Sequence, residues 1–131
     1  MYLVYNCCFC YNNFIFYLLM KKINLAITGC MGRMGQQIIK SARLDKDFKI
    51  VTLTESKKIK KKISGIQIDQ NNSKAFKKAD LIIDFTIPKC TFQVLDIASK
   101  LKKKMIIGTT GFTKKEEKLI KKFSKKIPIL K

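Results

Sequence analysis

The chain has 131 residues, enough for one domain, and a hydrophobic content of 47% that argues against disorder. It contains no histidine, which excludes catalysis by a histidine base within these residues. Its net charge of +19 comes almost wholly from lysine, because only Arg33 and Arg43 are arginine; since nucleic-acid surfaces favour arginine, we interpret the lysines as solvated surface, with polyanion binding as the alternative.

The first 20 residues carry no charged side chain, and their length would allow a membrane-spanning helix flanked by Lys21 and Lys22. A central strand is predicted to begin at Ile23, however. A helix held in a bilayer cannot continue into a buried strand after two residues. We therefore expect Met20 to be the true start and residues 1–19 to be upstream sequence. The expected protein is cytoplasmic, with no membrane partner.

From Ile23 onward, short apolar runs alternate with segments of helical spacing. The runs predict strands buried on both faces, at 23–28, 48–54, 65–68, 81–85, 105–108 and 127–130. The segments of helical spacing are 32–44, 73–79, 88–101 and a last one that a capping box opens at 113–116. The first has an apolar side formed by Met34, Ile38 and Ala42. The apolar positions of the last are Leu119, Ile120 and Phe123. Residues 56–64 are predicted to be a basic loop. The alternation predicts an α/β fold with a doubly wound parallel sheet, incomplete at its C-terminal end.

A glycine loop joins the first predicted strand to the first predicted helix, Gly29-Cys30-Met31-Gly32-Arg33-Met34-Gly35. Gly29 permits a tight turn, Gly32 lets the backbone approach a pyrophosphate, and Gly35 lets the helix pack on the sheet. The helix N-terminus offers N–H groups and a positive dipole to phosphates. The spacing GxxGxxG is a variant of the Rossmann-type dinucleotide fingerprint, and a tight turn without a ligand is the alternative.

Other segments of the sequence lie at the positions that a dinucleotide-binding site requires. Glu55 lies at the end of the second strand, twenty residues after Gly35, where an acid is expected to meet the adenosine ribose. Arg33 and the lysines from Lys57 onward could neutralise a 2′-phosphate, so the sequence leaves NADH and NADPH open. Segments 84–88 and 108–112 follow strand ends, where their threonines and glycines are expected to meet the nicotinamide, with ordinary turns as the alternative.

Three motifs together carry a family resemblance: Gly32-Arg33-Met34-Gly35, Asp84-Phe85-Thr86-x-Pro88 and Gly108-Thr109-Thr110-Gly111-Phe112. From about residue 22 to 131 the chain resembles the N-terminal domain of 4-hydroxy-tetrahydrodipicolinate reductases (dihydrodipicolinate reductases). The resemblance implies NAD(P)H-dependent reduction of 4-hydroxy-tetrahydrodipicolinate in lysine and diaminopimelate biosynthesis, by a homo-oligomer. Ser56 stands where some members carry an arginine that favours NADPH. The implied cofactor contacts are Gly29, Cys30, Met31, Gly32, Arg33, Met34 and Glu55, with Phe85, Thr86, Gly108, Thr109 and Thr110 at the nicotinamide end.

The resemblance also implies a second domain with a histidine-rich motif, a catalytic lysine and a substrate loop, none of which this sequence contains. We expect residues 20–131 to be the dinucleotide-binding domain, without catalytic or metal-binding residues and inactive alone. A small-molecule substrate is expected only if the missing domain is supplied. The alternatives are a non-catalytic nucleotide-binding remnant and a basic nucleic-acid-binding protein; the favoured interpretation includes no nucleic-acid partner.

Overall fold

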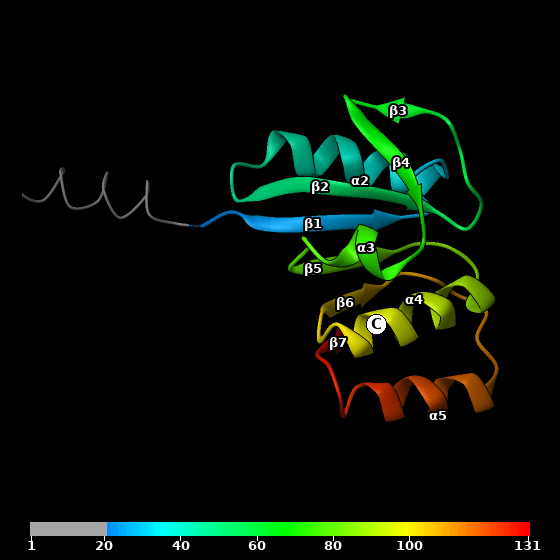
Figure 1. Ribbon diagram of the computed structural model, residues 1–131. Coiled ribbons are helices and arrows are strands. Elements are labelled where there is room, and N and C mark those ends of the chain that lie inside the picture. The colour runs from blue at the N-terminus through cyan, green and yellow to red at the C-terminus, as the bar shows by residue number, and fades with distance from the viewer. Residues whose placement is uncertain (1–20) are drawn as a thin grey trace, which may run out of the picture.

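The structure is a computed structural model that describes residues 21–131 (Figure 1). The predicted upstream segment 1–19, and the membrane-helix alternative for it, therefore lie outside the described residues. Among the residues that are described, no helix is long and apolar enough to cross a membrane.

In this part of the chain a seven-stranded sheet has the order β3-β4-β2-β1-β5-β6-β7. The strands are β1 (Ile23–Thr28), β2 (Phe48–Glu55), β3 (Lys62–Ile63), β4 (Ile66–Gln70), β5 (Leu81–Asp84), β6 (Lys104–Ile107) and β7 (Ile129–Leu130). Every neighbouring pair is parallel except β3 and β4. The predicted parallel sheet is thus confirmed. Because the chain proceeds outward from β1 in both directions, the order reverses between β1 and β5, where doubly wound sheets bind ligands.

The antiparallel edge strand β3 corrects the prediction of a loop over residues 56–64. Its two residues pair with β4 across a turn at Ser64 and Gly65, whose φ angles are 52° and 81°. A two-residue strand in a lysine-rich segment has no alternation that would distinguish it from a loop. Lysines on such an edge also discourage pairing with another chain.

Within residues 21–131, four helices lie along the two faces of the sheet: α2 (Arg33–Leu44), α3 (Ser73–Phe76), α4 (Pro88–Lys100) and α5 (Lys114–Phe123). Figure 1 shows α2 beside β1 and β2, and α4 and α5 toward the β7 edge. Successive side chains of β1 point to opposite faces of the sheet. Ala26 packs in the hydrophobic cluster that includes residues of α4, whereas Ile27 packs in the cluster that includes residues of α2. The predicted double winding is therefore present.

The buried side of α2 differs from the predicted one by a fraction of a turn. Gly35, Ile39 and Ala42 are buried, whereas Met34 is 51% exposed. The cause lies in the loop, because Gly35 must face the backbone of Gly29 and this rotates Met34 outward. A similar correction applies to α5, where Ile120 is buried and Leu119 is 42% exposed.

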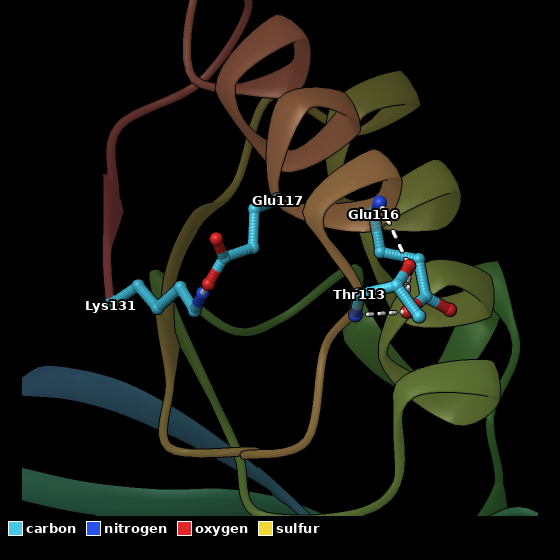
Figure 2. Close-up of polar contacts among 4 residues, drawn as sticks. All are labelled: Thr113, Glu116, Glu117 and Lys131. Atoms are coloured by element: carbon cyan, nitrogen blue, oxygen red, sulfur yellow. Dashed lines mark hydrogen bonds and ion pairs between the residues drawn. The ribbon is translucent and has the colours of Figure 1, made fainter.

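The start of α5 confirms the predicted capping box (Figure 2). The hydroxyl of Thr113 accepts the N–H of Glu116 at 3.3 Å, and the carboxylate of Glu116 accepts the N–H of Thr113 at 2.7 Å. Glu117 on the next position pairs with Lys131 at 2.9 Å. The capping box fixes where α5 begins, directly after the predicted ligand segment 108–112.

Candidate functional site

The segments predicted to bind a ligand meet at the carboxyl edge of the sheet. The glycine loop follows β1, Glu55 ends β2, residues 85–87 follow β5, and residues 108–111 follow β6. Parallel strands point the same way, so their carboxyl ends gather at one edge. The fold therefore assembles all the predicted segments around the point where the strand order reverses.

The glycine loop is packed so closely that two of its glycines cannot be replaced without a clash. Gly29 has a φ of +74°, and a Cβ there would lie 2.8 Å from the Thr86 methyl group. A Cβ on Gly35 would lie 2.2 Å from the carbonyl oxygen of Gly29. The first contact joins the glycine loop to the loop after β5, and the second seats α2 on the loop. Gly35 was predicted to let the helix pack tightly on the sheet, and its tight packing is against the backbone of Gly29 and Cys30, directly after β1.

The N-terminus of α2 has the features of an anion-binding site. Its N-cap residue is Gly32, no side chain caps it, and its first turn carries no acid. The helices α3 and α5 are instead capped by Asn72 and Thr113, and α4, which also lacks a side-chain cap and an acid in its first turn, begins at Pro88, a residue without an N–H to donate. The exposed stretch 31–34 and the missing side chain of Gly32 leave room for a phosphate beside the N–H groups of the first turn.

Glu55 is attached directly to this loop. Its Oε1 accepts the backbone N–H of Met31 at 2.7 Å. Burial, with a further contribution from the Glu55 charge, raises the pKa of the neighbouring Cys30 thiol to about 12. Cys30 therefore remains a neutral thiol at physiological pH and serves the loop by its backbone. Its carbonyl oxygen accepts the side-chain amide of Gln36 at 2.7 Å, a contact that sequence reasoning missed.

The two loops at the other end of the site are tied to each other. Buried Asp84 accepts the hydroxyl of Thr86 at 2.7 Å, and the Thr86 N–H donates to the Thr109 hydroxyl at 3.0 Å. Burial raises the pKa of Asp84, and hydrogen bonds from threonine hydroxyls partly oppose the shift. A Cβ on Gly108 would lie 2.0 Å from the Phe85 ring, so the ring rests on the backbone of Gly108.

The remaining predicted contacts, Arg33, Met34 and Thr110, are exposed at the rim of the site. Thr109 is only 4% exposed, so its hydroxyl serves the tie to Thr86 while its backbone borders the site. Cofactor contact by each predicted residue stays a prediction. The sequence did not reveal that Asp84 ties the two loops together, although it offered one signal: an aspartate that ends an apolar strand without a basic neighbour.

Residues 23–131 match the family model described as "Dihydrodipicolinate reductase, N-terminus". The 4-hydroxy-tetrahydrodipicolinate reductase of Pelagibacter ubique is 67% identical over 112 residues, which cover 86% of this chain and 43% of that protein. The same enzyme of Buchnera aphidicola subsp. Baizongia pistaciae is 40% identical over 124 residues, covering 85% of this chain and 46% of that protein. The chain thus spans less than half the length of these relatives.

Solved structures share the fold. A dipicolinate-bound dihydrodipicolinate reductase from Paenisporosarcina sp. TG-14 has a TM-score of 0.64 at 22% identity, over 79% of this chain and 43% of that one. A homoserine dehydrogenase from S. aureus has a TM-score of 0.67 at 21% identity, over 84% of this chain and 32% of that one. Both likenesses support a Rossmann-type α/β fold.

Proposed function

The chain belongs to the dihydrodipicolinate reductase family through its N-terminal domain, and on that premise we propose that it binds a nicotinamide dinucleotide at the carboxyl edge of its sheet. The observation that carries the proposal is the uncapped N-terminus of α2 at Gly32. An acid-free first turn and a glycine N-cap suit a pyrophosphate, which needs N–H donors and close backbone approach.

In this arrangement the pyrophosphate lies against residues 29–34 and the adenosine ribose against Glu55. The nicotinamide then reaches the loops at Phe85–Thr86 and Gly108–Thr110. When bound, the dinucleotide supplies a hydride; the residues of this chain bind and orient it. The assignment of Glu55 to the adenosine ribose is supported by its half-buried position and by its hydrogen bond from the Met31 N–H. Because this bond already fixes the carboxylate, it can accept ribose hydroxyls without reordering.

Both NADH and NADPH fit this proposal, for opposing electrostatic reasons. The Glu55 carboxylate disfavours a 2′-phosphate, whereas exposed Lys57 and Lys58 favour it. We expect Glu55→Gln, which keeps the acceptor for Met31 but removes the charge, to raise affinity for NADPH relative to NADH. Calorimetric titration of both dinucleotides checks this, and an unchanged ratio would argue that Glu55 lies away from the ribose.

The binding proposal is tested most sharply at Gly32. Aspartate is a good N-cap, so Gly32→Asp is expected to leave the melting temperature unchanged or higher. The same change places a carboxylate at the phosphate position and removes dinucleotide affinity. Gly32→Asn is the matched control, because it has the same size and capping ability without the charge. We expect it to weaken binding less than Gly32→Asp.

Dinucleotide affinity that survives in folded Gly32→Asp would contradict the proposed position of the pyrophosphate. Failure of the wild-type chain to bind NADH or NADPH, in a preparation that melts cooperatively, would contradict the function itself. The melting curve separates both outcomes from simple misfolding.

We further propose that the reaction served by this domain is the reduction of 4-hydroxy-tetrahydrodipicolinate, the activity for which its relatives are named. A chimera tests this: residues 20–131 replace the matching segment of the Pelagibacter ubique enzyme. We expect oxidation of the reduced dinucleotide that depends on the substrate. A folded chimera that binds the dinucleotide but does not oxidise it would count against the assignment.

A further inference from the structure

Asp84 connects three segments that lie apart in the sequence. Besides accepting the hydroxyl of Thr86 through Oδ1, it accepts the hydroxyl of Thr91 in α4 through Oδ2 at 2.5 Å. The hydroxyl of Thr109, after β6, lies 3.3 Å from the same Oδ2 and 3.0 Å from the oxygen of Thr91. One carboxylate therefore holds the loop after β5, the loop after β6 and the first turn of α4.

This carboxylate is expensive to bury. Asp84 is 0% exposed, and the two ion pairs of residues 21–131, Lys100–Asp96 and Lys131–Glu117, do not involve it. Neutral hydroxyls compensate a buried charge less fully than a cation would. Because burying this carboxylate lowers the stability of the fold, its position at the carboxyl edge of the sheet is better explained by a role in the neighbouring site.

We propose that Asp84 is a positioning residue for the nicotinamide end of the site: it draws the Thr86 and Thr109 hydroxyls inward, and so fixes the two loops that face the ring. This role rests on the proposed function. It also explains why the Thr109 hydroxyl is turned away from the surface, since the side chain holds the loop and the backbone at 108–110 is left for the ligand.

The same network fixes Phe85, which lies between Asp84 and Thr86 and whose ring rests on Gly108. Loosening Asp84 releases both loops together. The adenosine and pyrophosphate half of the ligand should be affected much less, because it lies against the glycine loop and Glu55, whose hydrogen bonds do not involve Asp84, although Gly29 packs against Thr86. The effect of Asp84 should therefore be much larger for ligands that carry a nicotinamide than for ligands that lack one.

The experiment compares NADH with ADP-ribose, which lacks the nicotinamide, by calorimetry on the 131-residue chain. For Asp84→Asn we expect NADH affinity to fall about tenfold, the equivalent of one lost hydrogen bond to a charged group. ADP-ribose affinity should stay within about twofold. We expect the melting temperature of Asp84→Asn to stay at or above the wild-type value even though NADH affinity falls, because the variant replaces a carboxyl group whose ionised form is costly to bury.

A second pair of variants keeps the test valid if Asp84→Asn does not fold. Thr91→Val removes a donor to Asp84 and the hydroxyl that lies 3.0 Å from the Thr109 hydroxyl, while every residue of the ligand loops stays unchanged; Thr91→Ser restores the hydroxyl. We expect the valine variant to weaken NADH selectively and the serine variant to recover wild-type affinity. Thr52→Val is the matched control, since Thr52 is a buried threonine whose hydroxyl donates to the Ala75 carbonyl at 2.9 Å, outside the network. It should leave the ratio of the two affinities unchanged.

Equal loss of NADH and ADP-ribose affinity in Asp84→Asn or Thr91→Val would overturn the inference, because it would show a general role in the fold. Unchanged NADH affinity in both folded variants would overturn it as well. In either case a wild-type chain that binds NADH leaves the proposed function standing. A folded wild-type chain that binds neither ligand overturns the proposed function and the inference together.

Discussion

Gly32 and Gly35 lie three residues apart in one loop, but the space around them differs. A Cβ on Gly35 would overlap the carbonyl oxygen of Gly29 at 2.2 Å, whereas one on Gly32 would lie 3.3 Å from the same atom. We therefore expect Gly35→Ala to destabilise the fold by about 3 kcal/mol or more, because backbone must move. Gly32→Ala should cost about 1 kcal/mol, as a poorer N-cap.

Urea unfolding of the two alanine variants measures this difference. Similar losses in both would contradict the account of the loop, in which Gly35 seats the helix and Gly32 gives room to the ligand. Gly32→Ala should also weaken dinucleotide binding while the chain remains folded.

Single residues differ in how well the sequence predicts their surroundings in the fold. The loop glycines were predictable because the spacing of three glycines between a strand and a helix has a known steric meaning. The exposure of Met34 was not, since its spacing from Ile38 and Ala42 suits a core face equally well. The contact between Asp84 and Thr91 was missed because nothing in a helical segment distinguishes a threonine that turns back to the preceding strand.

The capping box of α5 makes a pH-dependent contribution to the stability of the fold. The backbone N–H and the hydroxyl of Thr113 lower the pKa of Glu116. Because the folded-state pKa lies below the unfolded one, the contribution is present above the unfolded pKa and is lost as pH falls through the folded pKa. We expect wild type to exceed Glu116→Gln in stability at neutral pH and to lose that advantage in acid.

Glutamine is the matched replacement, because it can still accept the N–H of Thr113 without a charge. Unfolding midpoints of both proteins across the acid range provide the measurement. An advantage that persists unchanged below the pKa of a free glutamate would contradict the assignment of the shift to Glu116.

The elements themselves were largely predictable from sequence. Apolar runs bounded by glycine and polar residues identified β1, β2, β5 and β6, because strands buried on both faces need continuous apolar character. The edge strand β3 was not predicted, since two residues carry no period and edge strands can be polar. Strand order also lies beyond local pattern, although the alternation of strands and helices restricts it to doubly wound arrangements.

For the whole molecule, the net charge of +19 is the dominant feature. Crowded lysines repel one another in the compact state, so we expect the melting temperature to rise as salt is increased from about 10 mM to about 150 mM, where the screening length falls to about 8 Å. A polyanion-binding protein would also show a steep fall of affinity for duplex DNA with salt. Tight DNA binding of that kind would favour the alternative interpretation of the lysines.

Backbone amide NMR of the 131-residue chain during titration with NADH tests whether one edge of this sheet binds a nicotinamide dinucleotide. We expect chemical-shift changes at Gly29–Met34 and Glu55, with a second group at Phe85–Thr86 and Gly108–Thr110. Titration with ADP-ribose should reproduce the first group and leave the second unchanged. Shifts confined to the lysine-rich segment 57–62, or no shifts in a folded chain, would show that the dinucleotide does not bind at this edge.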